Sequence, residues 1–385
     1  MTALTIADVL AVPATGGYFA DDQGAIKAGA VRDGLAYPGD VRVPAEAVSV
    51  LLRLSDGYVA HGDCVSVQYS GVGGREPRLH AETLATRIRE EIPLRGMPVT
   101  GFRDMLVEGY GAAADYGLSQ ALLDAAAHRA GTTMAEVIAA EWDLPTTFAR
   151  VPLYAQTGEA RHDNVDKMVL KEVDSLPHGL INTPELAAGI VDYVRWVRDR
   201  VLRLRRREDY APILHFDVYG LLGPDVDTIL AMAEAAQPFA LRVEHPLDAG
   251  SREAQIHALR DLRERLGGRV QIVADEWANT VDDIRAFNAA GAADVIQIKT
   301  PDLGALHHTV EAILHCQAHG VVAHVGGSCA ETERSAQVTA HVAVGAHADQ
   351  MLAKPGMGVD EGVSIVRNEM FRLLEMALAG VYKPR

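Results

Sequence analysis

Four charged residues in the second half of the chain stand at the ends of apolar runs. Asp217 closes APILHFD, Glu244 lies in LRVEH, Asp275 lies in QIVADE and Lys299 closes DVIQIK. If these runs are successive parallel strands of one barrel, their carboxyl ends meet on one face. Three carboxylates there offer a nearly all-oxygen site, which suits the hard ion Mg²⁺. A single acid after a strand is more often a helix cap or a solvated residue, but three in register, followed by a lysine, favour a metal site.

Lys299 is the candidate general base beside this site. A divalent cation and burial both disfavour the charged form of a lysine, so we expect the pKa of Lys299 to be lowered toward a value useful for catalysis. A metal bound to a substrate carboxylate would stabilise the enediolate that forms when the neighbouring proton leaves. The pattern therefore predicts proton abstraction next to a carboxylate. Glu276 should point away from the site if the strand pleat continues, in a supporting role.

Further polar side chains stand near the ends of the same runs. They are Gln156, His178, Gln297, Ser328 and Cys329. Gln297 shares the inward face of Lys299 because side chains alternate along a strand. His178 follows the second expected strand and could act as an acid or base or bind a carboxylate, although an isolated loop histidine is more often idle. The sequence pairs no histidine with Cys329, so covalent catalysis is not favoured.

From about residue 151, short buried runs alternate with helical segments. The expected strands are 152–156, 167–171, 211–217, 241–245, 271–276, 294–299, 320–325 and 349–353. Eight strands, each followed by a helix, are what a (β/α)8 barrel of the TIM type requires. Thr183 and Pro184 stand where the cap and first turn of a long helix are expected. An open doubly wound sheet is the alternative, although it usually has fewer strands.

Up to about residue 150, strand patterns precede helical ones, which is typical of an α+β module. Two β-rich runs meet at Asp56–Gly57, a dipeptide suited to a hairpin turn. Helical spacing follows over 81–92, 116–131 and 133–142, with Gly131 as a helix stop. We therefore expect an N-terminal module over 1–150, a catalytic barrel over 151–354 and a C-terminal helical segment over 355–385 that packs back toward the N-terminal module. The glycine-rich SGVGGRE at 70–76 does not match a nucleotide-binding turn and is expected to be a mobile loop.

The composition is typical of a soluble globular protein. The chain has 385 residues, of which 52 are acidic and 36 basic, with a net charge of −16. No basic run is dense enough to neutralise phosphates, which argues against a nucleic-acid or membrane partner. The apolar stretches break off before the roughly 20 residues that span a bilayer, and the N-terminus lacks the basic start of a secretion signal, so we expect a cytoplasmic protein. Three widely spaced cysteines, Cys64, Cys316 and Cys329, offer neither a disulfide framework nor a CxxC metal site.

Several longer stretches of the sequence point to one family. In the barrel they are AQTGEARHDNVDKMVLK, LPHGLIN, HFDVYG, VADEWANT, QIKTPDLG, GGSCAETERSAQVT and AKPGMGVDEG, and near the N-terminus YFADDQGAIKAGAVRDGLAYPG and VAHGDCVSVQYSGVGGREP. These stretches resemble the methylaspartate ammonia-lyase family of the enolase superfamily. The resemblance implies a TIM-type barrel capped by the N-terminal module, and reversible elimination of ammonia from the small amino acid (2S,3S)-3-methylaspartate to give mesaconate. It also implies a required Mg²⁺, K⁺ as a possible activator, and a homodimer.

Motif by motif, the resemblance implies a role for each site residue. Asp217, Glu244 and Asp275 would be the metal ligands. Lys299 would remove the C3 proton, and His178 would act on the opposite face, toward the other C3 epimer. The substrate's carboxylates and amino group would be held by Gln156, Gln297, Ser328 and Cys329.

Three positions depart from the family pattern. This chain has His245, Ala278 and Ser328 where the family has Gly, Cys and Thr. Ser328 keeps a hydroxyl and a backbone N–H, so carboxylate binding should persist. His245 is bulky and titratable, and beside Glu244 it could narrow the pocket or change the metal affinity.

Two alternatives stay open at this stage. One is a racemase, epimerase or cycloisomerase of the same superfamily, which would carry a lysine pair on the second strand; Lys167 and Lys171 are four residues apart and do not fit one short strand as such a pair. The other is a binding or regulatory protein on a barrel that has lost its activity, against which the full set of ligands and base argues.

Overall fold

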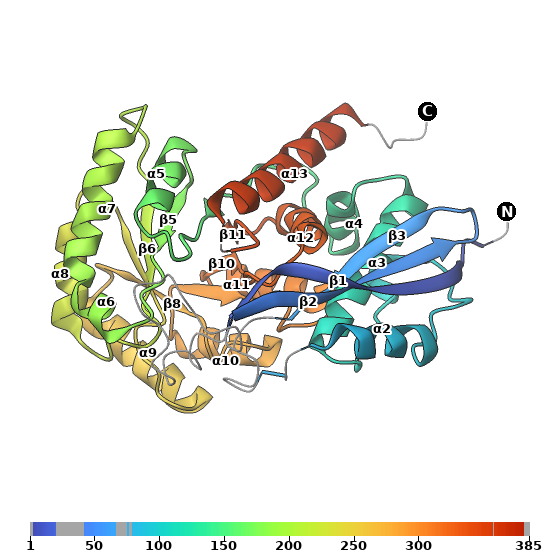
Figure 1. Cartoon of the computed structure of the whole chain (residues 1–385), viewed down its shortest axis with the longest axis horizontal. Coiled ribbons are helices and arrows are strands. Elements are labelled where there is room, and N and C mark those ends of the chain that lie inside the picture. Colours follow the sequence, from blue (N-terminus) through green and yellow to red (C-terminus); the bar gives the residue numbers. More distant parts are fainter. Residues whose placement is uncertain (1–2, 21–41, 67–74, 77–78, 357, 381–385) are drawn as a thin grey trace.

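Two parts make up the structure, a three-stranded antiparallel sheet with its helices and a closed eight-stranded parallel barrel (Figure 1). The computed structural model describes residues 3–20, 42–66, 75–76, 79–356 and 358–380. Within the segment 70–76, expected to be a mobile loop, only Arg75 and Glu76 belong to the described residues, so that prediction lies outside them. None of the helices in the described part of the chain has both the length and the apolar character needed to cross a membrane.

The N-terminal sheet consists of β1 (Ile6–Ala20), β2 (Arg42–Leu54) and β3 (Val59–Cys64), in that order. The hairpin between β2 and β3 turns at Asp56–Gly57, as predicted. The backbone N–H of Tyr58 donates to Asp56 at 3.0 Å, and Gly57 has a φ of +94°, which glycine adopts without strain. Alternate side chains of β2 are fully buried and form one apolar face, namely Val48, Val50, Leu52 and Leu54.

Four helical segments complete the N-terminal module. They are α2 (Ala81–Glu90), the short 3₁₀ helix η1 (Phe102–Asp104), α3 (Ala112–Ala130) and α4 (Met134–Glu141). Of these, α2 and α3 pack against the sheet, whereas η1 and α4 pack against α3. The predicted stop at Gly131 is confirmed, since its φ of +62° ends α3 in the left-handed region. α3 is buried on nearly all sides because it lies between the sheet and the barrel. A Cβ on Gly62 of β3 would lie 2.6 Å from the backbone N of Ala121, so glycine lets strand and helix touch.

The predicted barrel is confirmed, and the open sheet is excluded because the strands close into a ring. All neighbouring strands are parallel. The strands are β4 (Leu153–Tyr154), β5 (Ser175–His178), β6 (Ile213–Asp217), β7 (Leu241–Glu244), β8 (Gln271–Ala274), β9 (Val295–Ile298), β10 (Val322–Val325) and β11 (Gln350–Leu352). Their carboxyl ends therefore share one mouth.

The second barrel strand is the one that the sequence prediction placed wrongly. Most of the segment 167–171 lies in helix α5 (Asp163–Leu170), and the strand is β5, SLPH. The apolar positions Val165, Met168 and Val169 are three and four residues apart and buried on one helical face. His178 consequently ends β5 itself instead of following an earlier strand.

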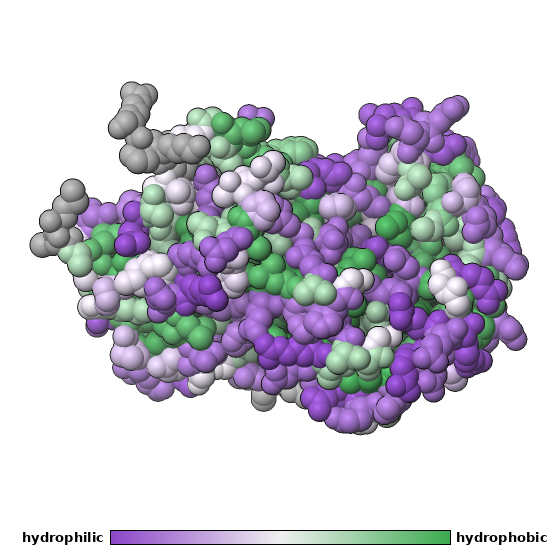
Figure 2. Space-filling model, turned by 180° about the vertical axis from the view of Figure 1, so that it is seen from behind, coloured by the Kyte–Doolittle hydropathy of each residue, from purple (hydrophilic) through white to green (hydrophobic). Residues whose placement is uncertain are grey.

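The remaining helices surround the barrel and extend past it. They are α6 (Pro184–Ala188), α7 (Ile190–Leu204), α8 (Val226–Ala236), α9 (Arg252–Leu266), α10 (Val281–Ala290), α11 (Leu306–Ala318), α12 (Glu333–Gly345) and α13 (Val359–Ala379). The Thr183 cap is confirmed, but the single helix expected after it is divided at Gly189. α13 packs against α12 and α5, and its packing toward the N-terminal module stays a prediction. Seen from behind, polar residues cover much of the surface, with smaller apolar groups between them (Figure 2).

Candidate active site

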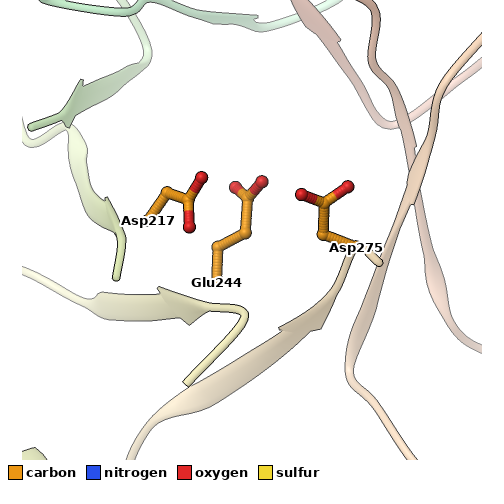
Figure 3. Close-up of side chains that lie close together, drawn as sticks. All are labelled: Asp217, Glu244 and Asp275. Atoms are coloured by element: carbon orange, nitrogen blue, oxygen red, sulfur yellow. The ribbon is translucent and has the colours of Figure 1, made fainter. Parts of the chain in front are cut away.

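Three carboxylates meet at the barrel mouth because three neighbouring strands end beside one another. Asp217 ends β6 and lies opposite Glu244, the last residue of β7, while Asp275 directly follows β8. One oxygen from each of the three lies within 4.8 Å of the others, and all three side chains are buried. Figure 3 shows the carboxylates side by side in the space between the strand ends. The prediction that these residues come together is confirmed.

The electrostatics of this cluster fit a bound cation. Burial raises the pKa of Glu244 well above its usual value, and the charges of Asp217 and Asp275 raise it further. The pKa of Asp275 is raised by burial and by the neighbouring charge of Glu276. Several carboxylates at such short separations cannot all ionise in a buried site without a counter-charge. A divalent ion that prefers oxygen ligands, such as Mg²⁺, matches both the charge and the donor atoms.

Hydrogen bonds hold the carboxylates in this arrangement. The imidazole of His215 lies 2.7 Å from Glu244 through Nε2, and the amide of Gln297 donates to the other oxygen of Glu244. The backbone N–H of Tyr219 donates to Asp217 at 3.0 Å. Burial, and then the charge of Arg242, lower the pKa of His215 well below its usual value, so its ring is neutral. Sequence reasoning missed His215, although it stands two residues before Asp217 on the same face of β6.

Lys299 directly follows β9 and reaches the edge of the carboxylate cluster. Its Nζ lies 2.7 Å from Asp275 Oδ1 and 3.4 Å from Glu276 Oε1. Burial by itself would lower the pKa of Lys299, but the charges of Asp275 and Glu276 outweigh it and hold the pKa above its usual value. This is the opposite of the lowering expected beside a cation. The physical reason is that the surrounding carboxylates stabilise the ammonium form until their charge is neutralised.

Glu276 does not point away from the site, so that expectation is wrong. The strand β8 ends at Ala274, and the alternation of side chains therefore does not extend to Glu276. Its carboxylate accepts from Lys299 and, at 3.3 Å, from Arg75 of the N-terminal module. Although burial would raise the pKa of Glu276, the charges of Lys299 and Arg75 bring it well below its usual value. Glu276 is thus an ionised partner of the candidate base.

Arg75 connects the N-terminal module to the barrel mouth. Its guanidinium is buried and donates through Nε to Asp302 at 2.7 Å, in addition to its contact with Glu276. A cavity of about 420 Å³ lies beside this contact, with walls from both parts of the chain that include Tyr110 and Asn279. The sequence offered no signal for Arg75, because its partners are more than 200 residues away along the chain.

His178 lies across the barrel from Lys299, since β5 and β9 are four places apart in the ring. Its Nε2 lies 3.3 Å from Asp217 Oδ2, and its Nδ1 accepts a hydrogen bond from the backbone N–H of Leu180 at 3.2 Å. A neutral imidazole that accepts at Nδ1 carries its proton on Nε2, on the side of the carboxylates. The backbone φ of His178 is +67°, a conformation that a non-glycine residue rarely adopts.

The remaining predicted residues are brought to the same mouth by the strand order. Gln156 follows β4 by two residues, and its side-chain amide packs against Gly356, where an added Cβ would lie 2.2 Å from the amide oxygen. Ser328 and Cys329 follow β10 and are buried, and the Ser328 hydroxyl accepts from the backbone N–H of Ala330 at 3.1 Å. Gln297 lies in β9 and contacts the carboxylate cluster directly.

His245 stands beside Glu244 in a strained conformation. Its φ is +45°, which costs a non-glycine residue about 1 kcal/mol. The ring is buried, with Nδ1 at 3.8 Å from Glu276 Oε2. The side chain therefore lies toward the partner of Lys299 at the rim of the site.

Two family models together match nearly the whole chain. The model of the methylaspartate ammonia-lyase N-terminus matches residues 4–143, and the model of the methylaspartate ammonia-lyase C-terminus matches residues 145–379. The chain belongs to the methylaspartate ammonia-lyase family. The resemblance inferred from the motifs is thereby confirmed.

Relatives of this family resemble the chain over almost its full length. The methylaspartate ammonia-lyase of Clostridium tetanomorphum is 47% identical over 97% of this chain and 99% of its own. A solved beta-methylaspartase from the same organism, a magnesium complex, is 47% identical with a TM-score of 0.90, over 98% of this chain and 100% of its own. The methylaspartate ammonia lyase of Citrobacter amalonaticus, solved with (2S,3S)-3-methylaspartic acid, is 43% identical with a TM-score of 0.92, over 97% of this chain and 100% of its own.

The alternative of a racemase or epimerase is not favoured. The L-Ala-D/L-Glu epimerase from Bacillus subtilis is 18% identical with a TM-score of 0.69, over 93% of this chain and 90% of its own, a likeness that shows the fold alone. Lys167 and Lys171 lie in and just after α5, outside the barrel strands, where both pair with Asp360 and are partly exposed to solvent. They do not form a lysine pair at the barrel mouth.

Proposed function

We propose that this protein is a Mg²⁺-dependent lyase that reversibly eliminates ammonia from (2S,3S)-3-methylaspartate to give mesaconate. The observation that carries the proposal is the arrangement at the barrel mouth: three buried carboxylates within 4.8 Å of one another and a lysine amine 2.7 Å from one of them. The membership of the chain in the methylaspartate ammonia-lyase family supports the choice of substrate and leaving group.

The three carboxylates are the proposed metal ligands. Asp217, Glu244 and Asp275 are buried, close together and supplied with only oxygen donor atoms. When bound there, Mg²⁺ would supply positive charge against the substrate carboxylate next to C3, which makes the C3 proton more acidic. Hydrogen bonds with His215 and from Gln297 hold both oxygens of Glu244 in place, so the carboxylate would be positioned to bind the ion.

Lys299 is the proposed base for the (2S,3S) substrate. Its neutral amine takes the proton from C3, the electron pair of the C3–H bond becomes the second bond between C2 and C3, and the C2–N bond breaks to release ammonia. Asp275 and Glu276 fix the position of the amine, since its Nζ lies 2.7 Å and 3.4 Å from their oxygens. Because the amine is already held in place, little further entropy is lost when it reacts with the substrate, and the reaction is faster.

His178 is the proposed acid or base for the opposite face of the substrate. It comes from β5, across the barrel from β9, and therefore faces a bound substrate from the other side. The Leu180 N–H at Nδ1 fixes the ring orientation and places the proton on Nε2. We expect His178 to serve the C3 epimer more than the (2S,3S) substrate.

The proposed substrate-binding groups surround this centre. They are Gln156, His178, Gln297, Ser328 and Cys329, which stand at or after the ends of β4, β5, β9 and β10. Their amide, imidazole, hydroxyl and backbone N–H groups suit two carboxylates and an amino group. The substrate would thus be held between the faces that carry Lys299 and His178.

The wider organisation completes the proposal. We assign residues 1–150 to a capping domain, 151–354 to the catalytic barrel and 355–385 to a C-terminal helical segment. The boundary between the two family models, at residues 143 and 145, supports the first division. We further propose a cytoplasmic homodimer with K⁺ as an activator, on the ground of the family resemblance.

The proposal is tested by running the reaction in reverse. Purified protein is incubated with mesaconate, ammonium and Mg²⁺, and the products are identified by NMR. The expected product is 3-methylaspartate, formed only when all three are present. A protein that binds Mg²⁺ but gives no product would refute the proposed reaction.

A further inference from the structure

A second buried group of charges lies beside the proposed active site. Lys354, two residues after β11, and Glu331, in the loop between β10 and α12, are both 0% exposed. The amine of Lys354 lies 3.0 Å from Glu331 Oε1. The proposed function assigns no task to either residue, although a buried ion pair is costly to form in a protein interior.

All three donor positions of the Lys354 amine are satisfied. It donates to Glu331 at 3.0 Å, to the hydroxyl of Thr300 at 3.0 Å and to the backbone carbonyl of Gly326 at 2.9 Å. Thr300 is the residue after Lys299, and Gly326 begins the turn that leads to Ser328 and Cys329. The one amine thus holds both the end of the strand with the proposed base and the start of the proposed substrate-binding turn.

Glu331 extends the same group of contacts to the N-terminal module. Its carboxylate accepts from the hydroxyl of Tyr116 in α3 at 3.1 Å and from the hydroxyl of Ser335. Its backbone carbonyl accepts from the N–H of Gly17 in β1 at 2.9 Å. The turn is therefore tied to both parts of the chain.

The glycines of the turn are required by this packing. A Cβ on Gly327 would lie 2.7 Å from both Glu331 Oε1 and Lys354 Cδ, and a Cβ on Gly326 would lie 2.6 Å from Cγ of Gln297. Real side chains do not approach so closely, so the backbone of the turn rests directly on the ion pair and on Gln297. We therefore expect a change in the ion pair to be felt by the turn.

We propose that Lys354 and Glu331 are positioning residues for the lyase reaction, which hold the turn from Gly326 to Cys329 and the Lys299 strand end in their working places. This inference rests on the proposed function. Neither residue contacts the substrate in this account; each acts through the backbone of the turn and through Thr300.

The first test compares Lys354→Met with the double variant Lys354→Met/Glu331→Gln. The single variant leaves Glu331 buried and without its cation, so its melting temperature should fall. The double variant removes both charges and should recover stability, yet it still lacks the hydrogen bonds to Gly326 and Thr300. We expect its kcat/KM for (2S,3S)-3-methylaspartate to fall roughly 10- to 100-fold, mainly through a higher KM, while its Mg²⁺ affinity stays within about threefold of wild type.

Hydrogen exchange gives a readout that does not depend on activity. Measured by mass spectrometry, the backbone amides of residues 326–332 should exchange faster in the double variant than in wild type, with the strands β6 to β8 unchanged. A double variant with wild-type kinetics and wild-type exchange in this turn would overturn the proposal. If the wild-type protein shows no lyase activity, faster exchange of residues 326–332 in the double variant would still show that the pair holds the turn, while the missing activity would reject the proposed function.

A matched control separates positioning from stability alone. Glu369→Gln on α13 weakens a partly buried pair, since the Glu369 carboxylate lies 2.9 Å from His341 of α12 and also pairs with Arg372. It should lower the melting temperature but leave kcat and KM unchanged. If neither Lys354 variant folds, Thr300→Val is tested instead, since it removes one hydrogen-bond acceptor of the Lys354 amine. Unchanged KM, kcat and hydrogen exchange in Thr300→Val would equally overturn the proposal.

Discussion

Two buried groups of charges stand at the same barrel mouth and differ in how well they are balanced. Around Lys354 every donor of the amine has an acceptor, and one carboxylate matches one ammonium. Around Glu244 three carboxylates crowd within 4.8 Å, and the nearby ammonium of Lys299 does not neutralise them. We call Lys354 and Glu331 the balanced group and Asp217, Glu244 and Asp275 the unbalanced group. The balanced group supports the structure. The unbalanced group has excess negative charge, which a bound cation would neutralise.

The pKa directions express the same difference. Burial raises the pKa of Glu244 and Asp275, and neighbouring acids raise it further, so the protein disfavours the charged forms of these groups. The pKa of Lys354 is lowered, because burial outweighs the charge and the hydrogen bond of Glu331, but here the neighbouring charge opposes the effect of burial instead of adding to it. Unequal charges in a buried cluster are therefore a better sign of a functional site than burial alone. The following variants test this comparison.

The largest effect is expected for Lys299→Ala. Removal of the proposed base should lower kcat for (2S,3S)-3-methylaspartate by about 10²-fold or more, because proton transfer to a positioned general base contributes about that much to the rate. Exchange of the C3 proton with deuterated solvent should be lost as well, while Mg²⁺ binding, measured by calorimetry, persists. A Lys299→Ala enzyme that keeps most of its exchange rate would refute the assignment of the base.

Removing one acid from the unbalanced group should stabilise the protein in the presence of a chelator. The raised pKa values mean that the unfolded chain loses these protons near pH 4, while the folded protein keeps them to higher pH. The free energy of unfolding without Mg²⁺ should therefore fall as the pH rises above about 4. Glu244→Gln removes one of the groups that cause this loss of stability. The variant should therefore melt at a higher temperature than wild type at pH 7 with chelator.

Added Mg²⁺ should make wild type melt at a higher temperature than Glu244→Gln. Wild type should gain about 2.7 kcal/mol when the ion is present at a hundred times its dissociation constant, whereas Glu244→Gln should gain clearly less and lose activity. Thermal unfolding at pH 5, 6, 7 and 8, with chelator or with Mg²⁺, provides the measurement. If the wild type in chelator loses no more stability than Glu244→Gln as the pH rises, the assigned direction of the Glu244 shift is contradicted.

A smaller and more selective effect is expected for His178→Ala. Because His178 faces the substrate from β5, its loss should lower kcat for the (2S,3R) epimer by about 10²-fold and for the (2S,3S) substrate by clearly less. Steady-state rates with both epimers give the ratio. Equal losses for the two would mean that His178 binds substrate without acting on C3.

The smallest effect is expected for His245→Gly. Glycine adopts the φ of +45° without strain, and the ring that is lost lies toward Glu276 at the rim. We expect kcat/KM to change by no more than about threefold, less than 1 kcal/mol of barrier. A large gain for aspartates with bulkier C3 groups would show instead that His245 limits the pocket.

The carboxylates of the unbalanced group could be predicted from the sequence, but the ion pair of the balanced group could not. Asp217, Glu244 and Asp275 were recognisable because each ends an apolar strand, and the barrel brings such ends together whatever the detailed packing. Lys354 and Glu331 lie after strands too, but a buried ion pair leaves no trace in hydrophobic spacing. Their partnership depends on side chains that meet only in the folded protein.

The other errors of the sequence-based predictions also have local structural causes. The second strand was misplaced because β5 is short and carries a proline, while the amphipathic α5 before it offers a stronger apolar pattern. Glu276 was assigned to the wrong side because β8 ends one residue before Asp275, where alternation stops. The contact of Arg75 with Glu276 joins positions 201 residues apart, which spacing cannot reveal.

The central claim is that the carboxylate group of this barrel holds the Mg²⁺ needed to eliminate ammonia from (2S,3S)-3-methylaspartate. The most direct measurement titrates Mg²⁺ into chelator-treated protein with this substrate and follows mesaconate by its ultraviolet absorbance. The account predicts no mesaconate without the ion, a rate that saturates with Mg²⁺, and no such rise for Asp275→Asn. Mesaconate formed at the full rate in chelator, or none with Mg²⁺ bound, would contradict it.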